Sequence, residues 1–168
     1  MIRVALAFAL ASALLASSGC GAGAGGTTSG PPSTSGPLLA FTGSTVDGKP
    51  FEGRRLAGKP VALWFWAPWC PTCLMQAPGI RQAQERSAAK VNIVGVASLD
   101  QAGAMPEFVR LAKVSAITNV SDPEGTIWKR FGVSEQSVLI LLDASGAEVY
   151  RGKPAAAEIP GRIAALAG

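Results

Sequence analysis

A run of six apolar residues, Val61–Trp66, restricts the fold of this chain more than any other segment. Its length and its lack of polar interruptions are typical of a strand that is covered on both faces at the centre of a sheet. Two further apolar runs, 91–97 and 138–142, have the same character, and segments with helical periodicity lie between them. Strands that alternate with helices and end in a hairpin predict an α/β domain with a central mixed sheet flanked by helices.

Turn residues and helix signals place the remaining elements. Asp47-Gly48, between two short extended pieces, predicts a hairpin ahead of the central strand. A helix is expected over 70–88, with Pro71 in its first turn and Pro78 inside it. The other expected elements are helices at 106–114, from 122–124 onward and at 159–166, and strands at 117–120 and 148–150.

Two short segments precede the part of the chain that is expected to fold. Residues 1–19 carry one charge, Arg3, followed by an apolar run that is too short to span a membrane and has the length of a signal-peptide core. Residues 20–37 consist almost wholly of Gly, Ala, Ser, Thr and Pro, which predicts a disordered tether. One domain is expected over 38–168, since 168 residues are too few for two ordinary domains.

Cys20 follows Gly19 directly after the apolar run, and this junction resembles a bacterial lipobox, in which small residues precede a cysteine that becomes lipidated. The position three residues before the cysteine, usually Leu, is Ser17 here. We expect a lipid anchor on Cys20 that holds the protein at the outer face of the cell membrane. Cleavage near Ala22, which would release a secreted protein, is the alternative.

The composition excludes several classes of activity. The chain has no histidine, so it cannot build a Ser-His-Asp or Cys-His catalytic pair or a His-ligated zinc or copper site. Its net charge of +4 comes with only 15% charged residues and no dense basic run, which argues against nucleic-acid binding. The groups left to attack or ionise near neutral pH are the thiols of Cys20, Cys70 and Cys73.

The motif Cys70-Pro71-Thr72-Cys73 places two thiols three positions apart, where the central strand gives way to a helix. Unpaired N–H groups and the positive end of the helix dipole favour the thiolate of Cys70, and Cys73 lies within reach of a mixed disulfide formed there. A zinc ribbon needs more cysteines or histidines, and a disulfide at this spacing is seldom a mere staple. We expect redox exchange with no cofactor and no metal, because a four-thiolate metal or iron–sulfur site would need a second copy of the chain.

The apolar strand, the motif Trp69-Cys70-Pro71-Thr72-Cys73 and Pro78 together resemble the signature of the thioredoxin superfamily. The segments 47–51, 58–61 and 131–143 are similar to its exported TlpA/ResA/DsbE-type branch, in particular the secreted DsbE-like proteins of actinobacteria. This resemblance covers about residues 41–166. It implies a thioredoxin-like fold with an N-terminal hairpin extension, and thiol-disulfide exchange outside the cytoplasm, where disulfides persist.

The resemblance also implies roles for single residues. It makes Cys70 the nucleophile and Cys73 the resolving thiol, and it gives Pro71 and Thr72, between them, the tuning of the redox potential.

Substrate contacts are implied on both sides of the cysteine pair. Trp69 is expected at the surface, in an apolar platform for unfolded or extended substrate, and Gln136 and Ser137 in a substrate-binding loop that faces the thiols. The other tryptophans, Trp64, Trp66 and Trp128, are expected in the core.

Three positions depart from the family pattern, and all lie near the expected site. Trp64 stands where thioredoxin has an acidic residue, and Gln76 stands where the TlpA/ResA branch often has Glu. Water or a carboxylate from elsewhere in the chain must therefore take the proton of Cys73. Ser137 replaces the cis-proline of the family. Because a cis bond before any other residue costs about 2.5–4 kcal/mol, we expect a trans peptide and a differently shaped loop.

These features predict an exported thiol-disulfide oxidoreductase that acts on protein substrates, with oxidative folding favoured. A redox partner at the membrane is expected to complete its cycle. Reduction of exported partners such as apocytochrome c is one alternative, since the direction depends on a reduction potential that the motif does not fix. A redox-weak substrate-binding module, in which the cysteine pair is a stable disulfide, is the other.

Overall fold

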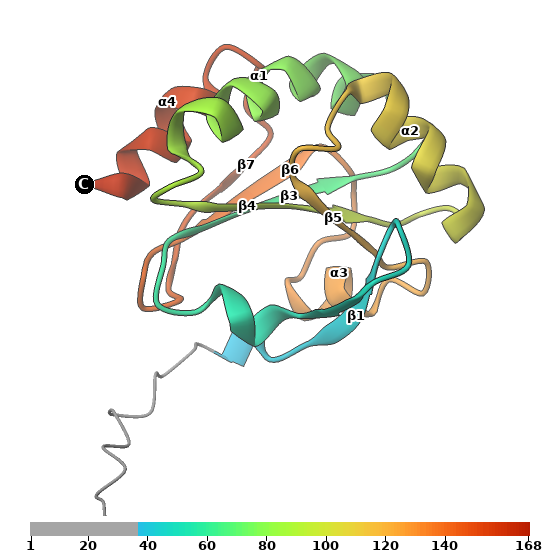
Figure 1. Ribbon diagram of the computed structural model, residues 1–168, viewed down its shortest axis with the longest axis horizontal. Helices are drawn as coiled ribbons and strands as arrows, with labels where there is room; N and C mark the ends of the chain where they lie inside the picture. The colour runs from blue at the N-terminus through green and yellow to red at the C-terminus, as the bar shows by residue number, and fades with distance from the viewer. Residues whose placement is uncertain (1–36) are drawn as a thin grey trace, which may run out of the picture. The chain divides into compact units, whose positions relative to one another are not determined.

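The computed structural model describes residues 37–168, which form a seven-stranded mixed sheet in the order β2-β1-β5-β4-β3-β6-β7 (Figure 1). β3 runs parallel to β4, and β4 to β5, whereas the other neighbouring strands are antiparallel. No helix within these residues has both the length and the apolar character needed to cross a membrane.

The elements follow the expected alternation. The strands are β1 (Thr42–Thr45), β2 (Pro50–Glu52), β3 (Val61–Trp66), β4 (Asn92–Ala97), β5 (Thr118–Ser121), β6 (Val138–Leu142) and β7 (Glu148–Gly152). The α-helices are α1 (Pro71–Ser87), α2 (Met105–Ala112), α3 (Thr126–Arg130) and α4 (Ile159–Ala164), and the short 3-10 helices are η1 (Pro37–Leu39), η2 (Gly53–Leu56), η3 (Ala102–Ala104) and η4 (Ala165–Ala167).

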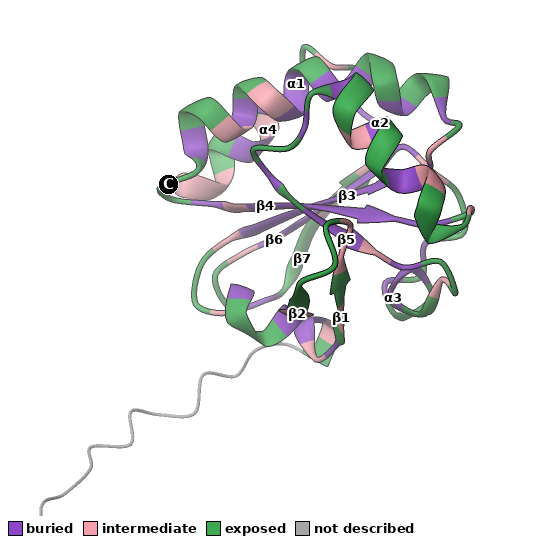
Figure 2. Ribbon diagram, turned by 45° about the vertical axis from the view of Figure 1, so that its right-hand side comes forward, coloured by how far each residue is buried: buried purple, intermediate pink, exposed green. Residues whose placement is uncertain are grey.

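β3 lies inside the sheet between β4 and β6, and all of its side chains are buried, as are most of those of these two neighbours (Figure 2). Trp64 and Trp66 point to the face covered by α1, α2 and α4, where Trp66 stacks on Phe108 with ring centres 4.2 Å apart. Phe65 points to the opposite face and packs edge-on against Trp128 of α3. The expected strand with two covered faces is confirmed, and so are the three core tryptophans.

The starts of two helices show what the local sequence does and does not reveal. α1 begins at Pro71, as expected, and continues through Pro78. α3 begins at Thr126, so the expected start at 122–124 was too early. The carboxylate of Asp122 reaches the helix across an intervening turn and accepts hydrogen bonds from the N–H groups of Thr126 at 2.8 Å and Trp128 at 2.9 Å. The sequence indicated the region in which this helix starts, but not the turn between Asp122 and Thr126.

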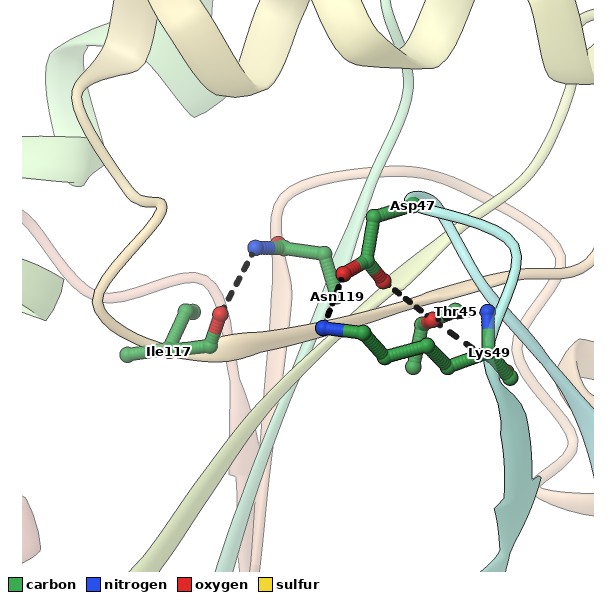
Figure 3. A network of polar contacts seen from close by, with 5 residues as sticks. All are labelled: Thr45, Asp47, Lys49, Ile117 and Asn119. Carbon is green, nitrogen blue, oxygen red and sulfur yellow. Dashed lines mark hydrogen bonds and ion pairs between the residues drawn. The ribbon is translucent and has the colours of Figure 1, made fainter.

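The N-terminal hairpin is confirmed, and it extends the sheet because β1 also pairs with β5. In the turn, the Asp47 carboxylate accepts a hydrogen bond from the Thr45 hydroxyl and pairs with the Lys49 ammonium at 2.8 Å (Figure 3). On β5 beside it, the Asn119 amide donates to the Ile117 carbonyl at 3.1 Å. These local bonds satisfy polar side chains of the hairpin turn and of β5.

Gly79 lies where α1 approaches the loop before α4, and a Cβ at this position would lie 2.2 Å from the backbone oxygen of Ala156. Gly79→Ala should therefore lower the free energy of unfolding by about 1 to 3 kcal/mol, although alanine is the better helix former. Gly161→Ala in α4 is the matched control, because nothing lies near the added methyl group. It should raise stability by up to about 1 kcal/mol. Urea unfolding compares the two, and a gain in stability for both variants would contradict the close approach.

Candidate active site

The candidate site lies where three strand ends meet at one edge of the sheet. β3 and β4 are parallel, so the loops that follow them, which carry Cys70 and Leu99, leave the sheet at the same edge. β6 runs antiparallel to β3 with Val138 opposite Phe65, so Ser137, just before β6, lies at this edge as well. The Ser137 N–H donates to the Phe65 carbonyl at 2.9 Å. Strand pairing thus brings together segments that are far apart in the sequence.

Cys70 and Cys73 are joined by a disulfide, with their Cα atoms 5.3 Å apart. Cys70 is the N-cap of α1, and its sulfur accepts a hydrogen bond from the Cys73 N–H at 3.0 Å. In the reduced protein, this N–H and the positive end of the helix dipole favour the thiolate of Cys70. Cys70 is 1% exposed and Cys73 0%, whereas Pro71 and Thr72 between them are exposed.

The Ser137 hydroxyl lies beside the disulfide, with Oγ 3.2 Å from the Cys70 sulfur and 3.3 Å from the Cys73 sulfur. Its peptide bond is trans, as expected, and its φ is +68°, in the left-handed region that L residues rarely adopt. Proline, whose φ is fixed at about −65°, does not fit this conformation. The loop beside the thiols therefore presents a hydroxyl where the family pattern has a proline ring.

Gln76 connects α1 to two loops and to β3 through three hydrogen bonds, here called the Gln76 clamp. Its side chain is 2% exposed, and Nε2 donates to the carbonyls of Ser137 and Pro154, both at 3.0 Å. Its Oε1 accepts from the indole N–H of Trp64 at 2.9 Å. An ionised carboxylate at this position has no hydrogen to donate to either carbonyl. The sequence predicted Trp64 in the core and marked positions 64 and 76 as lacking a carboxylate, but the bond between Trp64 and Gln76 was not predicted.

The loop that carries Pro154 is itself held in place. The Ala155 N–H donates to the Glu158 carboxylate at 2.9 Å, and Arg162 of α4 pairs with the same carboxylate at 2.9 Å. The Ala155 N–H and then Arg162 hold the pKa of Glu158 below its usual range. Glu158 therefore stays ionised at neutral pH and keeps this loop attached to α4.

The two sulfurs lie beside hydrogen-bond donors and not beside carboxylates. The Asp122 carboxylate accepts the Trp128 N–H of α3, and the Asp100 carboxylate accepts the Gln101 N–H at 2.7 Å. The hydrogen-bond partners of the sulfurs in residues 37–168 are the Ser137 hydroxyl and the Cys73 N–H. Such an arrangement stabilises negative charge on sulfur and supplies no strong proton acceptor.

Exposed apolar side chains occupy the segments next to the disulfide. Trp69 is 54% exposed, as expected, and its indole N–H donates to the carbonyl of Leu99, which is also exposed. Leu74 and Met75, just after Cys73, are exposed on the outer side of α1. These four residues form the apolar rim. Only Trp69 was predicted, although helical spacing marks 74 and 75 as outward positions when 73 and 77 face the core.

A hollow of about 560 Å³ adjoins the apolar rim at Leu99, and its other lining residues include Asp100 and Glu124. A second hollow, of about 440 Å³, lies between the N-terminal hairpin and α2, and its lining includes none of the residues around the disulfide. The first hollow shares Leu99 with the apolar rim, and neither hollow is lined by Cys70, Cys73 or Ser137. Within residues 37–168, no three His, Cys, Asp or Glu side chains are grouped so as to hold a metal ion.

Two predicted site residues remain. Gln136 is half-buried in the loop that ends at Ser137. Cys20 lies outside the described residues, together with the predicted signal segment and almost all of the predicted tether.

Comparisons with known proteins identify the family and fold of the chain. The family model of the AhpC/TSA family matches residues 35–152. The soluble secreted antigen MPT53 of Mycobacterium tuberculosis is 41% identical over 132 residues, which is 76% of this chain and 75% of that protein. The solved structure of dsbF from the same organism, in mixed oxidised and reduced forms, has 42% identity and a TM-score of 0.72, covering 77% of this chain and 96% of that one. A secreted disulfide oxidoreductase of that organism, homologous to E. coli DsbE, has 37% identity and a TM-score of 0.70, covering 76% and 97%.

Gln76→Glu tests the Gln76 clamp. At about pH 4.5 the new side chain is a protonated acid, which donates one hydrogen bond where the amide donates two, to the carbonyls of Ser137 and Pro154. The variant should therefore lose about 1 to 3 kcal/mol of unfolding free energy at this pH. Burial raises the pKa of the new carboxyl above its unfolded value, so stability is lost as pH rises through the folded-state pKa. The destabilisation should therefore be larger at about pH 8. Gln82→Glu, exposed on the same helix, is the control. Equal behaviour of the two variants in urea unfolding at both pH values would contradict the clamp.

Proposed function

Because the chain belongs to the AhpC/TSA family and is a secreted, DsbE-like thiol-disulfide oxidoreductase, we propose that Cys70 and Cys73 are its exchanging pair and act on exported proteins. The observation that carries this proposal is the position of Cys70 at the N-terminus of α1, bonded to Cys73 and to the Cys73 N–H. The pair gains or loses two electrons as its disulfide opens or forms. Pro71 and Thr72, exposed between the cysteines, are proposed to tune its potential.

The proposed direction is oxidation of substrate thiols. As an oxidant, the protein is attacked at Cys70 by a substrate thiolate, and its own cysteines depart as thiolates. Donors at both sulfurs stabilise those thiolates and therefore the reduced form of the pair. As a reductant, the protein would attack with Cys70 and would then have to deprotonate Cys73 for the resolving step, with Trp64 and Gln76 at the positions where the family pattern has an acid. Hydrogen-bond donors at the sulfurs therefore favour oxidation of substrate thiols over reduction of substrate disulfides.

Unfolded exported chains are the proposed substrates. The apolar rim offers contact to apolar segments that a folded protein would bury, with Trp69 beside Cys70 as its largest member. Gln136 and Ser137 are proposed to contact the substrate from the opposite loop. Both cysteines are buried, so we expect the side chains around Cys70 to move when a substrate sulfur approaches.

After each oxidation the reduced pair must lose two electrons before it can act again. A redox partner at the membrane is the proposed acceptor. Attachment through Cys20 would keep the domain near such a partner, and the following segment would let it reach substrates.

Cys70→Ser should reduce the reactivation of reduced, unfolded ribonuclease to the rate of the buffer alone, because the sulfur that forms the mixed disulfide is gone. Cys73→Ser, mixed with a substrate that holds a disulfide, should accumulate the mixed disulfide, because the Cys70 thiolate attacks that disulfide, releases one substrate thiolate and is not displaced by Cys73. A non-reducing gel detects this species. Cys20→Ala is the matched control, since it also removes one cysteine, and it should keep the parent rate. Activity of Cys70→Ser at the parent level would overturn the proposed function.

The reduction potential of the Cys70–Cys73 pair tests the direction. A value nearer that of DsbA, about −120 mV, than that of thioredoxin, about −270 mV, supports oxidation. A value at the thioredoxin end would support reduction of exported partners such as apocytochrome c instead.

We further propose that Cys20 carries a lipid. Its place after the apolar run of 1–19 and next to Gly19 supports this. The parent protein from cell membranes should enter the detergent phase in a phase-partitioning experiment, and Cys20→Ala should stay in the aqueous phase, because each CH₂ group of the attached lipid that is buried contributes about 0.8 kcal/mol. Aqueous behaviour of both would support release by the ordinary signal peptidase.

A further inference from the structure

We propose that the Ser137 hydroxyl is a catalytic hydrogen-bond donor that stabilises, one after the other, the two cysteine thiolates released during exchange. The proposal rests on the proposed function of Cys70 and Cys73. Its basis is geometric, since one oxygen lies 3.2 Å from the Cys70 sulfur and 3.3 Å from the Cys73 sulfur. Sulfurs in a disulfide carry no hydrogen, so the hydroxyl is the donor in the oxidised protein.

The position of the hydroxyl is fixed by the backbone of the same residue. The Ser137 N–H donates to the Phe65 carbonyl of β3, and the Ser137 carbonyl accepts from Gln76 of α1. These two bonds hold a φ of +68°, which is sparsely populated for a residue with a Cβ. Both backbone groups are used within the chain, so the hydroxyl is the group that Ser137 presents to the sulfurs. Gln76 is thus a positioning residue for it.

Burial makes this donor effective. Ser137 is 3% exposed and lies beside two buried cysteines, so little water competes for a charged sulfur. A hydrogen bond to an ionised acceptor in such surroundings is stronger than one between neutral groups.

In the first step, a substrate thiolate attacks the Cys70 sulfur. A bond forms between these two sulfurs, the Cys70–Cys73 bond breaks, and its electron pair leaves on Cys73. Ser137 donates to this thiolate from 3.3 Å. Stabilising the leaving thiolate speeds the attack, because thiols of lower pKa leave faster.

In the second step, another thiolate of the substrate attacks the substrate sulfur of the mixed disulfide. The substrate disulfide forms and the electron pair leaves on Cys70, where Ser137 and the Cys73 N–H both donate. The substrate loses two electrons and its two thiol protons, and the cysteine pair gains the two electrons. Neither step requires a base to deprotonate Cys70 or Cys73.

Ser137→Ala and Ser137→Gly test the proposal together. Both remove the hydroxyl, but glycine relieves the left-handed backbone while alanine keeps it. An effect of the hydroxyl moves both variants in the same way, whereas an effect of backbone conformation separates them. Ser134→Ala, exposed in the same loop, is the control.

The first measurement is the pH titration of the Cys70 thiolate by its ultraviolet absorbance in the reduced protein. Loss of the hydroxyl should raise the pKa of Cys70 by about one unit in both variants. The second is the reaction of the oxidised protein with a dithiol peptide, which should slow about tenfold. The third is equilibrium with glutathione, where about a tenfold shift toward the disulfide corresponds to about 30 mV. Ser134→Ala should match the parent in all three.

Parent-like pKa, rate and equilibrium in both variants would overturn the role of Ser137 while leaving the exchange function intact. Changes confined to one variant would assign the effect to backbone conformation and would also overturn it. A parent protein that oxidises no dithiol would overturn the proposed function itself, and the catalytic role with it.

Discussion

The antiparallel pairing of β3 with β6 is the constraint on which the site depends. Phe65 lies opposite Val138, and the ladder ends with the Ser137 N–H donating to the Phe65 carbonyl. β3 leads into the loop and helix that carry the cysteines, and β6 begins directly after Ser137, so this one register sets how the two segments face each other. A slip by one residue would turn every side chain of β6 to the other face and place Val138 or Gln136 in front of the sulfurs. The buried side chains of both strands prevent such a slip.

The Gln76 clamp explains why an amide suits this chain where its relatives often carry an acid. Three groups converge on position 76: two carbonyls, of Ser137 and Pro154, and one indole N–H, of Trp64. An amide satisfies all three, because it has two hydrogens and an oxygen. The aromatic residue at 64 and the amide at 76 are thus complementary and form one buried unit. With an amide at position 76 there is no carboxylate at this place near the thiols, and the amide supports the loop that carries the Ser137 hydroxyl.

Much of the fold and part of the candidate site could be predicted from the sequence, because these features depend on local patterns. The apolar run of β3, the helix opened by Pro71 and the exposed position of Trp69 all follow from residues within a few positions of each other. The partners of Gln76 are 12, 61 and 78 positions away, so no periodicity could have shown them. The left-handed conformation of Ser137 was also hidden, because two hydrogen bonds to distant elements impose it. The late start of α3 has a different, local cause, since a turn separates Asp122 from Thr126, whose N–H donates to the Asp122 carboxylate.

Hydrogen-bond donors beside the two cysteines do not suit both directions of thiol-disulfide exchange equally. Hydrogen bonds to a thiolate lower the pKa of the thiol, which makes the sulfur a better leaving group and, once ionised, a weaker nucleophile. Oxidation of a substrate uses the cysteines of this chain only as the point of attack and as leaving groups. Reduction of a substrate uses them as nucleophiles and requires Cys73 to lose a proton during the resolving step. In a chain without histidine, with Trp64 and Gln76 bonded to each other, the second requirement is met only by solvent or by the weak acceptor that Ser137 provides. We therefore propose that the contacts that stabilise the outgoing thiolates bias the protein toward introducing disulfides, through hydrogen bonds around the motif and not through Pro71 and Thr72 alone.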